Sequence, residues 1–133
     1  MAFILESTYD GAGTIIENEL MMTDSEAGVK GEAVKAVSGR LTKAATTDAP
    51  EFILAKTTAA GTDVETEYIR VRRDQVFLAD VVGTIANIAE GDNAVEISDD
   101  GLFVNADGAN TAGRIIIHSI DTVNNKARVS FNV

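Results

Sequence analysis

The sequence predicts an all-β fold, a small antiparallel β-barrel or β-sandwich with an extended N-terminal arm, and two observations lead to it. Val and Ile together number 25 in this chain of 133 residues, against 6 Leu, and 13 Thr accompany them. β-branched side chains lose less conformational freedom on a pleated strand than in a helix. Short apolar runs also recur at spacings of roughly 8–12 residues between turn-forming residues, as in barrels and sandwiches. The length is near that of one domain.

Residues 1–25 form the N-terminal arm or edge segment of this prediction, and residues 26–133 form a single β domain. The arm mixes short apolar clusters with the turn-rich stretches "YDGAG" and "TDSEAG". Chain termini are ordered only when something holds them in place. We therefore expect this segment either to supply edge strands to its own domain or to lie against a partner chain.

The clearest early strand signal is a hairpin in "GEAVKAVSGRLTKA", residues 31–44. Apolar and polar residues alternate there around Ser38-Gly39, a dipeptide suited to a tight hairpin turn. The loop "TTDAP" follows, and its Pro50, the only proline in the chain, favours an extended residue before it. The apolar stretch "EFILAKTT" is then predicted to be a short strand.

The middle of the chain is predicted to contain longer strands. In "VETEYIRVRR", residues 64–73, the alternation changes register, which indicates a bulge or a strand buried on both faces. The stretch "DQVFLADVVGTIANIAEGDN", residues 74–93, holds two β-rich runs broken at Gly83. Its "VVGTIANIA" portion also fits a helical turn.

The C-terminal part predicts two further strand pairs. "AVEIS" and "LFVNA" flank the turn "DDG", and the arms Arg114–Ile120 and Lys126–Val133 flank "DTVNN". The second arm should be a half-buried antiparallel strand. Its inward residues are expected to be Ala127, Val129, Phe131 and Val133, and its outward residues Lys126, Arg128, Ser130 and Asn132.

Charge and composition exclude several classes of protein. The formal net charge of −10 is the wrong sign for holding phosphates, so we expect no nucleic-acid partner. The absence of cysteine excludes disulfides and thiolate metal sites. The apolar start "MAFIL" is too short for a signal peptide, and no run approaches the roughly 20 residues that span a bilayer. We expect a soluble protein made in a cytoplasm, without a membrane partner.

Candidate catalytic and metal-binding residues each have a simpler structural interpretation. Asp99-Asp100 precede Gly101 and are expected to shape a turn. Residues 105–110, "NADGAN", crowd oxygen ligands but fail the spacing of a calcium-binding loop. The single histidine, His118, is expected on the surface or edge of a strand, because one histidine without cysteines rarely binds zinc. The sequence predicts no enzyme, cofactor, metal site or small-molecule ligand.

The only basic cluster, "RVRRD", suggests contacts with proteins. Arg70 and Arg72 share one face of the expected strand, and Arg73 lies at its end. In so acidic a chain they should pair with carboxylates of the chain itself or of a partner rather than with phosphates. Aromatic residues make up 5% of the chain and Trp is absent, which disfavours stacking platforms for sugars or single-stranded nucleic acid.

The order of these motifs resembles a known family. From about Gly31 to Val133 the chain runs through "KGEAVKAVSGRLTKA", "DAPEFILAKTTA", "EYIRVRRDQVFLAD", "VEISDDGLFVNA" and "GRIIIHSIDTVNNKARVSFNV". This order resembles the head decoration, or capsid cement, proteins of tailed bacteriophages. The resemblance implies a non-enzymatic β-protein on the outer capsid surface of a virion, synthesised in the host cytoplasm. It also implies a homotrimer that bridges major capsid protein subunits and stabilises the head.

The residues expected to contact the capsid or a neighbouring protomer come from the arm and the basic cluster. They are Phe3, Ile4, Leu5, Tyr9, Arg70, Arg72 and Arg73. Another virion structural β-protein, such as a tail-tube, baseplate or spike component, is the first alternative function. A carbohydrate-binding module is the second, and an enzyme would require convergent carboxylates in a pocket.

Overall fold

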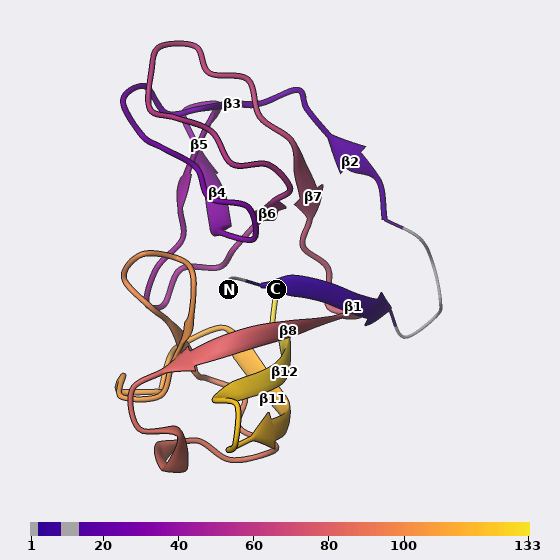
Figure 1. Ribbon diagram of the computed structural model, residues 1–133, viewed down its shortest axis with the longest axis vertical. Helices are drawn as coiled ribbons and strands as arrows, with labels where there is room; N and C mark the ends of the chain where they lie inside the picture. Colours follow the sequence, from indigo (N-terminus) through magenta and orange to yellow (C-terminus); the bar gives the residue numbers. More distant parts are fainter. Residues whose placement is uncertain (1–2, 9–13) are drawn as a thin grey trace.

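The computed structural model describes residues 3–8 and 14–133, and this part of the chain forms two six-stranded sheets without an α-helix (Figure 1). The first sheet contains β1 (Ile4–Thr8), β8 (Gln75–Val82), β9 (Glu96–Ile97), β10 (Val104–Asn105), β11 (Ile115–Asp121) and β12 (Lys126–Phe131). The second contains β2 (Ile16–Glu17), β3 (Met21–Met22), β4 (Ala33–Val37), β5 (Arg40–Lys43), β6 (Phe52–Leu54) and β7 (Tyr68–Arg70). Both sheets curl into half-barrels, which confirms the predicted all-β class.

Strand β8 organises the first sheet. It pairs antiparallel with β12 and with β1, and its last two residues pair parallel with β10. The strand order is β11-β12-β8-β10-β9, and β1 joins beside β8. Residues 75–81 of β8 alternate between buried and half-buried, so one face of the strand lines the core.

The hairpin β4–β5 forms where the sequence predicts it. Ser38 and Gly39 have φ angles of 51° and 77°, so both turn residues adopt the left-handed conformation that a two-residue hairpin turn requires. Strand β6 follows Pro50, as predicted, and the structure pairs it with β4. The order of the second sheet is β2-β7-β6-β4-β5-β3.

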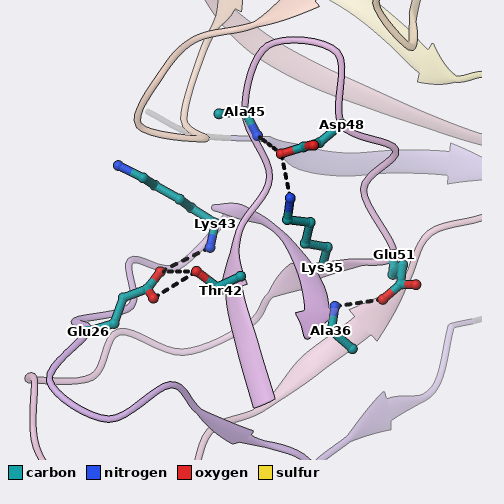
Figure 2. Close-up of polar contacts among 8 residues, drawn as sticks. All are labelled: Glu26, Lys35, Ala36, Thr42, Lys43, Ala45, Asp48 and Glu51. Atoms are coloured by element: carbon teal, nitrogen blue, oxygen red, sulfur yellow. Dashed lines mark hydrogen bonds and ion pairs between the residues drawn. The ribbon is translucent and has the colours of Figure 1, made fainter. Parts of the chain in front are cut away.

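Carboxylates from the flanking loops hold the β4–β5 hairpin (Figure 2). Asp48 Oδ2 accepts hydrogen bonds from Lys35 Nζ at 2.9 Å and from the Ala45 N–H at 3.1 Å. Glu51 lies just before β6, and its Oε2 accepts a 2.6 Å hydrogen bond from the Ala36 N–H. Ala36 lies beyond the end of the β4–β6 pairing, so the Glu51 side chain supplies the acceptor that a strand would otherwise provide.

Two apolar clusters form the core, and β6 contributes to both. Ile53 belongs to the larger cluster, in which the Phe77 and Phe131 rings meet edge to face with centroids 5.4 Å apart. Phe52 and Leu54 point the other way, into a smaller cluster. That cluster contains Met22, Val34, Leu41, Phe52, Leu54 and Tyr68. Strand β6 is therefore buried on both faces, as its continuous apolar sequence requires.

Three details differ from the sequence prediction. The strand expected over residues 64–73 is only Tyr68–Arg70, because its partner β6 is three residues long. Ser130 was expected outward but is buried, where its Oγ lies 2.7 Å from His118 Nε2. Val133 was expected inward but is exposed beyond the end of β12.

For two stretches the sequence allowed two structures, and the protein adopts one of them. After Gly83 the chain forms a short 3-10 helix, Ile85–Asn87, and, in this described stretch, no second strand before β9, so the helical-turn interpretation is correct and the second β-rich run is not a strand. The described residues of the arm supply the edge strands β2 and β3 of the second sheet and β1 beside β8. No helix in the described part of the chain is long and apolar enough to cross a membrane.

Candidate interaction surfaces

The arm residues predicted to make contacts differ in how deeply the structure buries them. Phe3 is 2% exposed, and its ring meets that of Phe131 edge to face at 5.2 Å, so it packs in the core of its own chain. Leu5 is half-buried against the same core, whereas Ile4 is exposed. Tyr9 lies outside the described residues. Three arm residues predicted to make contacts are described by the structure, and of these Ile4 alone has an exposed apolar side chain.

Figure 1 shows β1 between the two sheets. An apolar groove of about 420 Å³ lies beside this strand. Ile4 and Leu5 line it from β1, and Ile53 and Ile69 line it from β6 and β7. Phe3, Lys30, Gly31, Leu54 and Ala55 complete the lining.

The three arginines of the basic cluster each have a side-chain partner within the chain. Arg70 Nη2 lies 3.1 Å from Glu17 Oε1, and its guanidinium lies 4.9 Å from the centre of the Phe52 ring. Arg72 Nε lies 3.3 Å from Asp74 Oδ1. The expectation that Arg70 and Arg72 pair with carboxylates is therefore confirmed. Arg73 instead donates a 2.7 Å hydrogen bond to the side-chain amide oxygen of Asn132.

Arg70 and Arg72 border an exposed apolar edge that sequence analysis did not single out. Ile15 and Ile16 are 79% and 60% exposed, and Ile16 lies on β2, the edge strand of the second sheet. A hollow of about 460 Å³ lies beside them, lined by Thr14, Ile15, Glu17, Glu19, Arg70, Arg72 and Gln75. We call Ile15, Ile16, Glu17, Arg70 and Arg72 the β2 edge. It combines apolar side chains, charged groups and the outer side of an edge strand.

A second polar site was also missed by the sequence analysis and is built around Glu32. Glu32 is 5% exposed, and its Oε2 has no hydrogen-bond partner among the described residues. Its backbone is fixed, because its N–H donates to the Val29 carbonyl at 2.9 Å and its carbonyl accepts from the Leu54 N–H at 2.9 Å. Gly31 precedes it with a φ of 89°, a conformation that glycine adopts without strain.

Two further carboxylates lie around Glu32, of which Glu26 is held by residues of β5 and Asp100 by its own turn. Glu26 accepts hydrogen bonds from the Thr42 hydroxyl and, at 2.9 Å, from the Lys43 N–H (Figure 2). Asp100 Oδ1 accepts from the Ser98 hydroxyl and from the Leu102 N–H at 3.1 Å, so it shapes the turn as predicted. The pocket between these groups measures about 390 Å³. We call it the Glu32 pocket, lined by Glu26, Ala27, Val29, Glu32, Thr42, Lys43, Asp100 and Leu102.

The electrostatics of this pocket favour a protonated Glu32. Burial, together with the negative charges of Glu26 and Asp100, raises the pKa of Glu32 to about 7. A backbone hydrogen bond from Val29 and the positive charge of Lys43 act in the opposite direction. Removing a carboxylate from water disfavours its charged form, and like charges nearby add to that effect.

The other oxygen-rich stretches have structural partners. Asp107 Oδ1 accepts hydrogen bonds from the Thr84 N–H at 2.9 Å and from Asn87 Nδ2 at 3.0 Å. Asn110 exchanges hydrogen bonds with Glu96. His118 is exposed on β11, as predicted. Within residues 3–8 and 14–133, no group of three histidine or acidic residues is arranged to hold a metal ion.

Comparison of the chain with protein-family models, with curated proteins and with solved structures finds no significant match. Among the described residues, the β2 edge carries exposed apolar groups, and the Glu32 pocket carries a buried carboxylate oxygen without a hydrogen-bond partner.

Proposed function

We propose that this protein is a non-enzymatic capsid decoration protein of a tailed bacteriophage. It binds the outer surface of the assembled head as a homotrimer and bridges neighbouring major capsid protein subunits, which stabilises the shell. The motif order of residues 31–133 supports the family. The observation that supports a protein partner is the β2 edge, where two adjacent isoleucines are exposed, Ile16 on an edge strand and Ile15 directly before it.

The β2 edge has the composition of a protein interface. Ile15 and Ile16 supply an apolar centre, and the ion pair between Arg70 and Glu17 supplies a polar rim. Edge strands present backbone groups that a strand from another chain can pair with. Contact with another protein would remove the isoleucines from water, which favours association by roughly 25 cal/mol for each Å² of apolar surface buried.

A decoration protein can hold to a shell through modest contacts. A trimer engages several capsid subunits at once, so each further contact forms at high effective concentration. Bridging of this kind needs a rigid body rather than catalytic groups. The two packed cores and the hairpins joined by short turns suit that requirement.

Capsid binding by edge variants tests this proposal. Purified empty heads, assembled from the major capsid protein encoded in the same genome, are mixed with the protein and sedimented. The double variant Ile15→Asp with Ile16→Asp should bind at least about tenfold more weakly, because charged groups cannot be buried without a partner. Val123→Asp is the matched control, since Val123 is 90% exposed on the β11–β12 hairpin of the other sheet and should bind as wild type does.

Light scattering on the free protein accompanies this assay, and a mass of three chains is expected. Failure of the wild-type protein to sediment with heads would contradict the proposed function. Undiminished binding by the double variant would remove the β2 edge from it.

A further inference from the structure

We propose that the Glu32 pocket receives the ammonium or guanidinium group of a Lys or Arg side chain from a partner protein. The pocket places a buried carboxylate, two further carboxylates and an apolar wall around one opening. The partner is the capsid protein of the proposed function, so this inference rests on that function. The pocket chemistry itself can be tested without capsids.

The unpaired oxygen of Glu32 is the first argument. Buried polar atoms in folded proteins almost always have hydrogen-bond partners, and a buried acceptor without one costs roughly 1–3 kcal/mol. Glu32 Oε2 has no partner among the described residues, although the side chain is almost fully buried. Protonation removes the charge without supplying the missing hydrogen bond. A donor from outside the chain would supply it, and a cationic donor would also offset the charge.

The arrangement of charge is the second argument. Glu26 and Asp100 lie close enough to Glu32 for their negative charges to disfavour its ionisation. Lys43 is the cationic residue on the pocket lining, and it makes no ion pair with any described residue. Figure 2 shows its side chain extending away from the Glu26 carboxylate. Three carboxylates and one cation, Lys43, therefore line the pocket, and Lys43 forms no ion pair with any of the three carboxylates.

The shape and lining of the pocket select the kind of cation. Ala27, Val29 and Leu102 form apolar parts of its wall. The side chains of Lys and Arg carry a charged head on a chain of methylene groups, so they match a pocket with carboxylates and apolar walls together. A bare metal ion gains nothing from these apolar groups. A volume of about 390 Å³ also has room for a side chain rather than an ion alone.

The close approach of two loops builds the pocket. Gly101 has a φ of 76°, and a Cβ atom there would lie 3.0 Å from the Ala33 carbonyl oxygen and 3.3 Å from Glu32 Cγ. The Gly101 carbonyl accepts a hydrogen bond from the Ala33 N–H at 2.9 Å. This packing fixes Asp100 against the start of β4, so the carboxylates are held in place before any cation enters.

Carboxylate NMR on the isolated protein tests the pocket with two probes, n-butylammonium and n-propylguanidinium chloride. The ¹³C carboxyl resonance of Glu32 is followed during titration at pH 6 and at pH 8, at constant ionic strength. Binding should be about tenfold tighter at pH 8, because the cation binds the ionised form of a group whose pKa is about 7. Glu32→Gln should weaken binding at least about tenfold and abolish this pH dependence.

Two further variants separate the pocket from general attraction by an acidic protein. Glu90→Gln removes one exposed carboxylate outside the pocket and should leave probe binding unchanged. Lys43→Gln removes the resident cation, which should raise the pKa of Glu32 further. At pH 8, where Glu32 is largely ionised, loss of the Lys43 charge should tighten probe binding. Equal weak binding of both probes by wild type, Glu32→Gln and Glu90→Gln would overturn the inference. Displacement of the probes by micromolar Ca²⁺ would overturn it as well, since it would indicate a metal site.

Capsid sedimentation then separates this inference from the proposed function. If the probes bind at Glu32 and Glu32→Gln weakens head binding by about tenfold or more, the pocket is a capsid contact. If heads bind wild type and Glu32→Gln equally, the function stands and the pocket inference fails. If heads bind neither protein, the proposed function fails, while the NMR titration still decides whether the pocket takes a basic group.

Discussion

At the scale of single residues, Glu32 shows how burial raises the pKa of a carboxyl group. Nothing in the local sequence sets Glu32 apart from the other glutamates. Its side chain is almost fully buried, and the charges of Glu26 and Asp100 lie nearby. The folded protein therefore holds a proton on Glu32 at pH values where the unfolded chain releases it. The stability of the protein must depend on pH through this group.

Replacing Glu32 by Gln should make the protein more stable in alkaline solution. The pKa is raised from 4.5 to about 7, so the stability associated with protonated Glu32 is fully present below pH 4.5 and is lost as pH rises to about 7. Gln cannot ionise and keeps that stability. At pH 8 the free energy of unfolding of Glu32→Gln should exceed that of wild type by roughly 3 kcal/mol, since each pKa unit is worth about 1.4 kcal/mol. The excess should shrink toward zero at pH 4.5.

Urea denaturation followed by circular dichroism at pH 5, 6, 7 and 8 measures this difference. Comparing the two proteins at each pH cancels the titration of the other carboxyl groups. A difference that is the same at every pH would show that Glu32 is ionised alike in the folded and unfolded states.

The arginines illustrate what local sequence can predict about a site. An acidic chain with a single basic cluster predicts pairing with carboxylates of the chain itself or of a partner, and Arg70 and Arg72 are paired within the chain. No local sequence pattern predicts the Glu32 pocket. Glu26, Glu32 and Asp100 meet only because Ala33 bonds to the loop at Gly101 and β4 pairs with β5. Those contacts join segments distant in sequence, so neither spacing nor alternation could indicate them.

At the scale of elements, the hairpins were predictable because their signals are local. The turn at Ser38-Gly39 and the alternation of residues 126–131 each lie within one stretch of chain. Strands β9 and β10 are paired and lie within the predicted stretches "AVEIS" and "LFVNA", whose flanking "DDG" turn is a local signal. Strands β2 and β3 have two residues each, which is too few to show any period. Strand β7 was overestimated for a related reason, because the length of β6, not the sequence of β7, limits the pairing.

The carboxylates around β4 and β5 stabilise this hairpin from outside the ladder, and Asp48 provides a test. Partial burial would raise the pKa of Asp48, but hydrogen bonds from Lys35 and from the Ala45 N–H, with the Lys35 charge, outweigh this and lower it. Asp48 therefore contributes stability above pH about 4, which is lost as pH falls through its lowered pKa. Because the pair is about one-third exposed, Asp48→Ala should cost only about 1 kcal/mol at pH 7.

Thermal unfolding at pH 7 and at pH 2.5 measures this contribution. The difference between wild type and Asp48→Ala should be largest at pH 7 and much smaller at pH 2.5. Asp99→Ala, at an exposed carboxylate in the neighbouring "DDG" turn, should change stability by less than about 0.5 kcal/mol at either pH. If the two variants behave alike, the Asp48 contacts do not stabilise the hairpin.

At the scale of the whole molecule, the N-terminal strand and β6 join the two sheets. β1 pairs with β8 of the first sheet, while the Phe3 N–H donates a 3.0 Å hydrogen bond to the Gly31 carbonyl beside the second. Ile53 of β6 packs in the larger core, and its neighbours Phe52 and Leu54 pack in the smaller one. Neither core can lose its packing without disturbing a strand that the other requires. The sheets should therefore unfold together.

Phe3→Ala tests this coupling from the end of the chain. Phe3 is 2% exposed, and removing a buried phenylalanine ring typically costs about 3–5 kcal/mol. Ile4→Ala is the matched control, because Ile4 is exposed on the same strand and should cost less than about 1 kcal/mol. Methyl NMR in urea separates the cores, since the Ile117 methyl resonances report the larger core and the Leu54 methyl resonances report the smaller one. In Phe3→Ala both sets of resonances should lose their native chemical shifts at one lower urea concentration. Loss of the native Ile117 shifts before the Leu54 shifts would show that the two sheets unfold separately.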